Sequence, residues 1–97
     1  MSQPLFKKVA FIGLGLIGSS LARIIVAEKL ATTIVASTRS QKTLEDAKSL
    51  GLIQEGFSDP VEAVKGADLV VLALPVRATQ KVLEQIKPYL SETTIVT

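Results

Sequence analysis

The chain has 97 residues and contains no Cys, no His and no Trp. These absences exclude a thiol nucleophile, an imidazole base, a disulfide framework and a zinc site built from nitrogen and sulfur ligands. Hydrophobic residues make up 47% of the sequence and charged residues 21%, which is typical of a globular protein. The net charge is +2 and the aromatic content is 4%, so the sequence does not favour a nucleic-acid-binding surface.

Short apolar runs rich in β-branched residues alternate with longer segments of helical spacing. The strand-like runs are Val9–Ile12, Thr33–Ala36, Leu69–Leu74 and Thr94–Val96. The helical segments cover residues 16–29, 40–50, 59–66 and 77–89. The strand-like runs are continuous rather than alternating, which predicts strands buried on both faces. The order of the segments predicts an α/β fold: a doubly wound parallel sheet of about five strands between two layers of helices.

The first two predicted helices show which faces they should bury. The apolar stripe of the first consists of Ile17, Leu21, Ile24 and Ile25. The second begins after Ser40, a favourable N-cap, and ends before Gly51, which suits a left-handed C-terminal cap. The predicted inward face of the second helix consists of Leu44, Ala47 and Leu50.

The third predicted helix has a starting signal in Asp59-Pro60-Val61-Glu62. These residues supply an N-cap, a proline at the first helical position and a capping-box acid at the third. The helix is short and stops at Gly66. The last predicted helix has Pro88 near its end, and its inward residues are Val82, Leu83 and Ile86.

An apolar run from Val9 to Ile17 follows Lys7 and Lys8, as the apolar part of a signal peptide would. The run contains two glycines, no convincing cleavage site follows it, and a bilayer span needs roughly 20 residues. We therefore expect neither a signal peptide nor a membrane partner, and we expect a cytoplasmic protein.

A glycine motif joins the first predicted strand to the first predicted helix: Gly13-Leu14-Gly15-Leu16-Ile17-Gly18. This is the context in which G-x-G-x-x-G binds a dinucleotide. Gly13 would allow a tight turn, Gly15 would let the pyrophosphate approach the backbone, and Gly18 would let the helix pack closely on the strand. The N–H groups and partial positive charge of the helix N-terminus would face the diphosphate. A glycine-rich turn without a ligand is the alternative.

A nucleoside-triphosphate-binding P-loop does not fit the same segment. That motif requires Gly-Lys followed by Ser or Thr, whereas Ser19, Ser20 and Leu21 follow the last glycine here. The motif therefore favours a dinucleotide and argues against hydrolysis of ATP or GTP.

The end of the second predicted strand predicts which dinucleotide binds. NAD-specific sites place an Asp or Glu about 20 residues after the glycines, where it binds the ribose hydroxyls. Here Thr38 stands at that point, and no acid lies between Glu28 and Glu45. The guanidinium of Arg39 can pair with a 2′-phosphate. Hydroxyl donors and a further positive charge nearby come from Ser37, Thr38, Ser40 and Lys42. The segment predicts NADP, with NAD as the alternative; a solvated Arg39 beside a helix cap is the interpretation without a ligand.

A second wall of the cofactor site should follow the third of the strand-like runs, because open parallel sheets bind ligands where the strand order reverses. The predicted cofactor contacts in this wall are Leu74, Pro75, Val76 and Thr79, with Gln80 within reach on the next helical turn. Arg77 is either a further contact or a surface cation near the helix start.

Three segments of the sequence resemble the prephenate/arogenate dehydrogenase family of tyrosine biosynthesis. They are the glycine motif extended through Ser19-Ser20-Leu21-Ala22, the tetrapeptide Leu50-Gly51-Leu52-Ile53, and the segment Ala67-Asp68-Leu69-Val70-Val71-Leu72-Ala73-Leu74-Pro75-Val76. The resemblance extends from Val9 to Thr97. The 3-hydroxyisobutyrate and 6-phosphogluconate dehydrogenases usually have Met where Ile17 stands.

The resemblance implies a Rossmann-type NAD(P)-binding domain over residues 1–97, followed in the family by a helical domain that forms a homodimer. Family members oxidise prephenate or arogenate by hydride transfer to NAD(P), coupled to loss of the ring carboxylate. Their catalytic His and substrate-binding Arg lie beyond the fifth strand, so the resemblance implies cofactor-binding residues, and neither catalytic residues nor a metal site, in this chain. Many members have Asp at the end of the second strand, whereas this sequence has Thr38 and Arg39, which again favours NADP.

The last predicted strand reaches the end of the sequence, so we expect residues 1–97 to be the N-terminal part of a longer enzyme; a small complete protein is the alternative. A final strand without following elements would leave an unpaired edge and uncovered apolar faces, which predicts self-association or marginal stability. Two other functions remain open: a dehydrogenase of the β-hydroxyacid or pyrroline-carboxylate reductase type, and a non-catalytic NAD(P)-sensing module. An Asp-x-Gly-Ser segment and a Gly-x-His beyond residue 97 would favour the first interpretation.

Overall fold

The computed structural model describes residues 5–14, 16–90 and 94–96, with only the backbone of Leu16, Ile17 and Val76. In this part of the chain the strands are β1 (Phe6–Ile12), β2 (Ala31–Ser37), β3 (Glu55–Phe57), β4 (Leu69–Leu72) and β5 (Ile95–Val96). The helices are α1 (Leu16–Ala27), α2 (Gln41–Ser49), α3 (Pro60–Val64) and α4 (Val76–Ile86), and a 3₁₀ turn, η1 (Lys87–Tyr89), follows α4.

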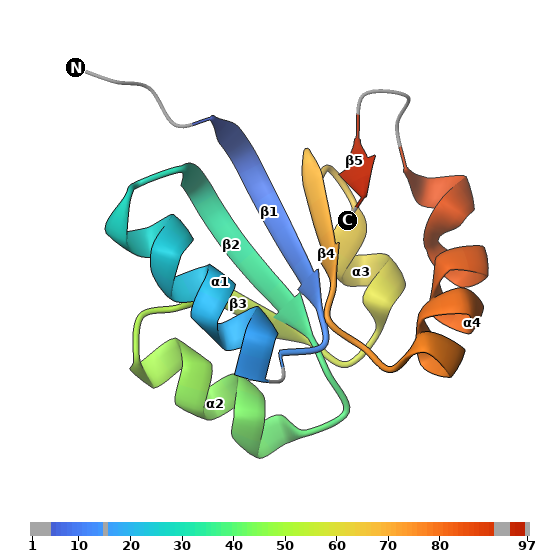
Figure 1. Ribbon diagram of the computed structural model, residues 1–97, viewed down its shortest axis with the longest axis horizontal. Coiled ribbons are helices and arrows are strands. Elements are labelled where there is room, and N and C mark those ends of the chain that lie inside the picture. The colour runs from blue at the N-terminus through green and yellow to red at the C-terminus, as the bar shows by residue number, and fades with distance from the viewer. Residues whose placement is uncertain (1–4, 15, 91–93, 97) are drawn as a thin grey trace.

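The strands form one parallel sheet in the order β3-β2-β1-β4-β5 (Figure 1). The chain therefore first builds outward from β1 through β2 to β3 and then returns to the other side of β1 with β4. This reversal between β1 and β4 confirms the predicted doubly wound sheet. It also fixes the position, at the carboxyl ends of β1 and β4, where such sheets bind ligands.

Two apolar cores lie on opposite faces of the sheet, and β1 contributes to both. Val9 and Phe11 belong to the core under α1 and α2, whereas Ala10 and Ile12 belong to the core under α3 and α4. All four are at most 3% exposed. Successive side chains of a strand point to opposite faces, so a strand covered on both sides needs an unbroken apolar run. The predicted three-layer arrangement is confirmed.

The predicted N-caps and the glycine C-cap are present in the structure. The predicted capping-box role of Glu62 is not seen in the described part of the chain, where the Glu62 carboxylate pairs with Lys65 at 3.1 Å. The Ser40 hydroxyl accepts a hydrogen bond from the Thr43 N–H, and Gly51 has a φ of +75° directly after the C-cap of α2. The Leu52 N–H donates to the Ala47 carbonyl, which completes a Schellman ending. The Asp59 carboxylate caps α3 through the Val61 N–H at 2.9 Å, and proline occupies the first helical position.

The strand β3 is not among the strand-like runs of the sequence and lies between the second and third predicted helices. It has only three residues, Glu55, Gly56 and Phe57, and they do not form an apolar run. Its pairing with Val35–Ser37 of β2 makes it a strand. A Cβ at Gly56 would lie 2.8 Å from the Leu44 side chain, so glycine allows α2 to pack closely here.

Two predicted inward residues face solvent instead. Ile24 is 54% exposed, because the line of α1 that faces the sheet runs through Gly18, Ala22 and Ile25. Leu50 is 61% exposed, since the chain turns at the end of α2 and buries Leu52 and Ile53 in its place.

The last strand also differs from its prediction. It begins at Ile95 rather than Thr94, and its two residues are 54% and 36% exposed rather than buried. The predicted third strand-like run ends at Leu72, two residues early. The exposed Ile95 and Val96 agree with the expected uncovered apolar surface, while self-association remains a prediction. Within the described ranges, no helix has the length and apolar character of a membrane span.

Asp68 connects three strands at the amino end of the sheet. Its carboxylate accepts hydrogen bonds from the N–H groups of Lys7 and Lys8 at 2.5 and 3.2 Å. Its carbonyl accepts one from the Ile95 N–H at 2.9 Å. The side chain thus supplies acceptors to the start of β1, before the ladder with β4 begins at Val9.

We expect Asp68→Ala to lower the free energy of unfolding by about 1–2 kcal/mol, because two backbone donors lose a charged acceptor. Urea denaturation monitored by circular dichroism measures the change. Glu84→Ala on the exposed side of α4 is the matched control, and we expect it to change stability by less than about 0.5 kcal/mol. Equal stabilities of the two variants would contradict the assigned role of Asp68.

Candidate cofactor-binding site

The chain leaves β1 through a turn that only glycine accommodates. Gly13 has a φ of +83°, and its N–H donates to the Ser37 carbonyl at 2.7 Å. A Cβ at this position would lie 2.5 Å from the Ala73 carbonyl oxygen. Gly13 therefore makes the predicted tight turn, and the space that a side chain would need is filled by the end of β4.

Gly18 and Ser19 hold the start of α1 against this turn. A Cβ at Gly18 would lie 3.0 Å from the Ala73 Cβ and 3.4 Å from the Gly13 carbonyl oxygen, so the close packing predicted for this glycine is seen. The hydroxyl and the N–H of Ser19 both donate to the Leu14 carbonyl, at 2.8 and 3.1 Å. The loop is thus closed onto the first turn of the helix.

Of the other residues of the glycine motif, the structure describes the side chain of Leu14 only. Gly15 lies outside the described residues, and for Leu16 and Ile17 only the helical backbone is described. The Leu14 side chain is 3% exposed and belongs to the core under α1 and α2. Only the backbone of Leu14 is therefore available to a ligand.

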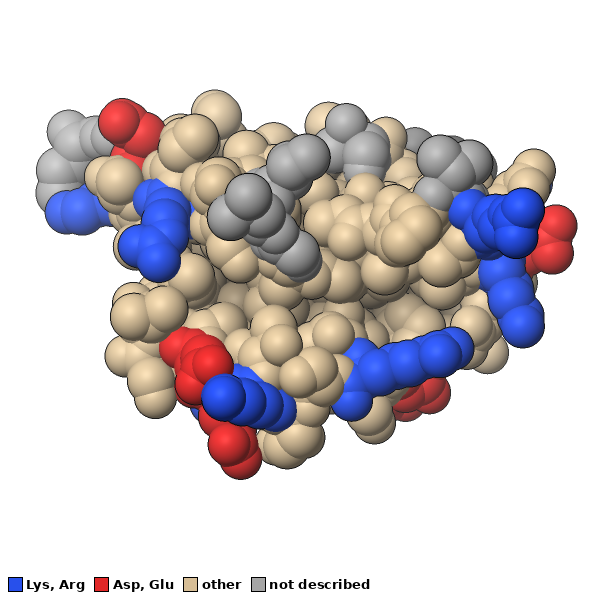
Figure 2. Space-filling model, turned by 60° about the horizontal axis from the view of Figure 1, so that its bottom comes forward, with Lys and Arg blue, Asp and Glu red and all other residues tan. Residues whose placement is uncertain are grey.

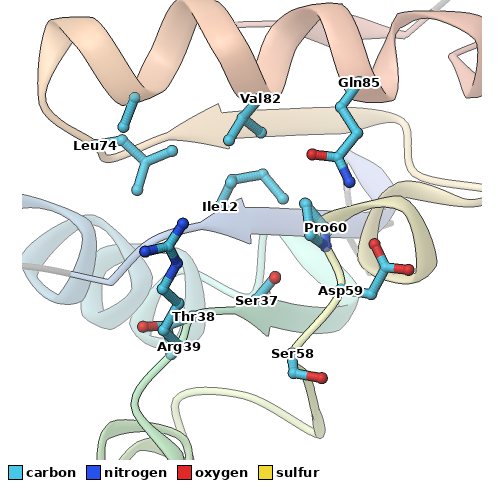
Figure 3. A pocket seen from close by; sticks show the side chains of 11 residues that line it. Ile12, Ser37, Thr38, Arg39, Ser58, Asp59, Pro60, Leu74, Val82 and Gln85 are labelled. Carbon is cyan, nitrogen blue, oxygen red and sulfur yellow. The ribbon is translucent and has the colours of Figure 1, made fainter.

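A cavity of about 660 Å³ opens beside this turn at the carboxyl end of the sheet. Figure 2 brings this end of the molecule forward and shows a hollowed surface with Lys and Arg side chains on both sides. The lining residues are Ile12, Ser37, Thr38, Arg39, Ser58, Asp59, Pro60, Leu74, Ala78, Val82 and Gln85 (Figure 3). The volume lies within the range of small-molecule sites, roughly 300–1,000 Å³.

Three of the predicted contacts at the end of β2 line this cavity: Ser37, Thr38 and Arg39. Figure 3 shows the Arg39 side chain extending from the end of β2 toward Leu74. In the described part of the chain no hydrogen bond or ion pair engages its guanidinium group. Arg39 is exposed, so the cavity has a free positive charge at this end.

Ser40 and Lys42 lie outside the lining. The Ser40 hydroxyl caps α2, and its N–H donates to the Thr38 hydroxyl at 3.3 Å. Lys42 is exposed on the first turn of α2. Ser40 thus shapes the turn that carries Arg39, and a direct cofactor contact of Ser40 stays a prediction.

The second predicted wall is only partly assembled. Leu74 lines the cavity, and Pro75 is the N-cap residue of α4. Val76 begins that helix, and its side chain lies outside the described atoms. The Thr79 hydroxyl donates to the carbonyls of Leu74 and Pro75, at 3.2 and 3.0 Å, and Thr79 does not line the cavity. Arg77 and Gln80 are exposed and also lie outside the lining.

Besides Ile12, which was predicted only as a strand residue, two groups of lining residues were not predicted from the sequence. Ser58, Asp59 and Pro60 follow β3, and because that strand was not recognised, the segment was not placed at the carboxyl end of the sheet. The other group, Ala78, Val82 and Gln85, lies on α4. Their spacing of four and three places them on one face of the helix, a signal that could have been found from the sequence.

The observed topology, glycine turn and cavity at the point of strand reversal define a Rossmann-type dinucleotide-binding domain. A family model described as "NADP oxidoreductase coenzyme F420-dependent" matches residues 8–97. The chain belongs to this family.

Individual relatives and solved structures agree with this placement. The cyclohexadienyl dehydrogenase of Zymomonas mobilis is 39% identical over 94 residues, which cover 97% of this chain and 32% of that protein. The crystal structure of Synechocystis arogenate dehydrogenase is 32% identical, with a TM-score of 0.80, over 92% of this chain and 31% of that one. The chain spans about a third of the length of these proteins.

A more distant structure supports the fold alone. The prephenate dehydrogenase from A. aeolicus, solved in complex with hydroxyphenyl propionate and NAD+, matches with a TM-score of 0.83 at 24% identity. The match covers 99% of this chain and 33% of that one.

Gly13→Ala and Gly51→Ala separate two costs at left-handed glycines. Both have a positive φ, which costs an L-residue roughly 1–2 kcal/mol. A Cβ at Gly51 meets no atom within 4 Å, whereas one at Gly13 meets Ala73. We expect Gly13→Ala to lose about 1–3 kcal/mol more unfolding free energy than Gly51→Ala in chemical denaturation. Equal losses would show that β4 does not constrain the turn.

Proposed function

We propose that this chain is the cofactor-binding part of a prephenate- or arogenate-type dehydrogenase, which couples oxidation of its substrate to loss of carbon dioxide. The observation that carries the proposal is the cavity beside the Gly13 turn, where the sheet reverses its strand order. The similarity to the Zymomonas and Synechocystis enzymes favours this dehydrogenase type over other users of the same fold. When bound, the nicotinamide dinucleotide would supply the hydride acceptor.

The residues present fit a dinucleotide. The α1 helix has 12 residues and begins at Leu16, inside the glycine motif. The first N–H groups of a helix have no partners within it, so the backbone N–H groups of the motif would face a diphosphate. Ile12, Leu74 and Val82 give the cavity apolar walls for a base. Arg39 supplies a positive charge that has no hydrogen-bond or ion-pair partner among the described residues.

The cofactor is NADP in this proposal. The Arg39 guanidinium offers paired donors that match a phosphate, and the neighbouring Thr38 offers a hydroxyl. Asp59 also lines the cavity, but Figure 3 places it at the opposite end from Arg39. A 2′-phosphate bound near Arg39 would therefore stay away from this carboxylate. In NAD-specific sites the carboxylate follows the second strand directly.

The remaining parts of the reaction belong, in this proposal, to protein outside residues 1–97. The chain spans about a third of its relatives, and it contains no His that could act as a base. Substrate binding, proton transfer and the contacts of a homodimer would come from the other parts of the complete enzyme. The 97 residues would bind the cofactor and orient it.

Calorimetric titration with NADP⁺ and NAD⁺ tests the proposal. We expect NADP⁺ to bind about tenfold more tightly, which corresponds to roughly 1.4 kcal/mol. Arg39→Ala should remove this difference and leave NAD⁺ affinity nearly unchanged, because NAD⁺ has no 2′-phosphate. Arg23→Ala removes an exposed cation of α1 that does not line the cavity; it is the matched control and should preserve the preference.

Two results would contradict different parts of the proposal. A preference for NAD⁺, or an NADP⁺ preference that survives Arg39→Ala, would refute the role of Arg39. Failure of both dinucleotides to bind would refute cofactor binding by this chain.

A further inference from the structure

The end of the cavity opposite Arg39 carries hydrogen-bonding side chains that the proposed function does not yet use. Asp59 and Gln85 both line the cavity, and Figure 3 shows the Gln85 amide and the Asp59 carboxylate at this same end, on either side of Pro60. Asp59 comes from the segment after β3 and Gln85 from α4. Two elements far apart in the sequence thus bring an acceptor group and an amide together.

The Asp59 carboxylate has an oxygen left over for a ligand. Its Oδ1 atom accepts from the Val61 N–H at 2.9 Å, which fixes the side chain as the cap of α3. Among the described residues, no hydrogen bond engages its second oxygen or the amide of Gln85. An ionised carboxylate only accepts hydrogen bonds, whereas an amide both donates and accepts. The side chain is held in position and keeps one acceptor free.

The walls between this end and Arg39 are apolar. Ile12, which is 3% exposed, and Val82 lie between Arg39 and Asp59 in Figure 3, and Leu74 lies at the Arg39 end. A flat apolar ring with polar atoms along one edge matches such a surface. The purine base of a dinucleotide has this shape, and its amino group is a hydrogen-bond donor.

We propose that Asp59 recognises adenine: its free carboxylate oxygen accepts a hydrogen bond from the 6-amino group, while the Gln85 amide bonds to a ring nitrogen. This inference rests on the proposed function, because it assigns the base of the same dinucleotide. It adds a determinant for the base that is separate from Arg39, the determinant for the 2′-phosphate. The carboxylate would disfavour hypoxanthine, whose 6-oxo group is an acceptor facing another acceptor.

The test compares NADP⁺ with its deamino analogue, in which hypoxanthine replaces adenine, by calorimetric titration of the chain and its variants. We expect the unmodified chain to bind NADP⁺ about five- to tenfold more tightly than the analogue. Asp59→Asn should abolish or reverse this ratio, because the amide can donate to the 6-oxo group. Asn is also a good N-cap, so α3 should be retained.

Control variants separate recognition from folding. Glu62→Gln removes an exposed carboxylate from the same helix, where it pairs with Lys65 at 3.1 Å, and should leave the base preference unchanged. Arg39→Ala should weaken both ligands equally and keep their ratio. Melting temperatures within a few degrees of the unmodified chain would show that Asp59→Asn still folds.

Other results of the titrations would overturn the assignment of Asp59 or the proposed function. An unchanged ratio in Asp59→Asn, or no preference in the unmodified chain, would overturn the assignment of Asp59 while leaving cofactor binding intact. If neither dinucleotide binds, the proposed function fails and the assignment of the base fails with it.

Discussion

The close approach of Gly13 and Gly18 to Ala73 is the constraint on which the site depends. Ala73 follows β4, and its N–H donates to the Ile12 carbonyl at 2.9 Å, so β4 is fastened to the end of β1. The two glycines leave no volume between the turn, the start of α1 and this residue. Ile12 directly precedes Gly13, and Leu74 directly follows Ala73. The contact between Gly13 and Ala73 therefore also fixes Ile12 at the floor of the cavity and Leu74 in one wall.

The opposite wall is fixed through the backbone of β2. The Gly13 N–H donates to the Ser37 carbonyl. Thr38 follows Ser37, and its N–H donates to the Phe57 carbonyl of β3 at 3.2 Å. The backbone hydrogen bonding between β2 and β3 therefore continues to Thr38, the residue directly before Arg39. The short strand β3 has a function in this arrangement: it orders the segment that delivers Asp59 to the cavity. Without β3, the position of Asp59 in the sequence does not predict that it lines the cavity.

The fold was predictable where one local signal was sufficient. Continuous apolar runs identified the central strands, and the caps at Ser40, Gly51 and Asp59 identified helix ends, because these signals arise from neighbouring residues. β3 escaped because three residues with a glycine in the middle form a strand only through pairing with β2. The exposure of Ile24 likewise depends on which line of α1 meets the sheet, which periodicity alone does not decide.

The same distinction applies to the site. Arg39 could be placed from its spacing after the glycines, since β1, which leads into the motif, pairs with β2. Asp59 was found as a helix cap but not as a lining residue, because its place in the cavity is created by the missed strand. Thr79 was predicted to be a wall residue, yet its hydroxyl donates to the carbonyls of Leu74 and Pro75, which directly precede its own helix.

The positions of charge around the cavity connect the fold to the proposed preference for NADP. A carboxylate directly after β2 would face the ribose hydroxyls and repel a phosphate there. In this chain the cation follows β2 and the carboxylate follows β3, one strand further out in the sheet. This displacement puts opposite charges at opposite ends of one apolar cavity. A phosphate and a base carrying an amino group are the two ends of an adenosine phosphate, so the electrostatic asymmetry would also orient the nucleotide. Exchanging the residue types at positions 39 and 59 would place a carboxylate after β2 and a cation after β3. It should therefore weaken NADP⁺ binding more than either single substitution does.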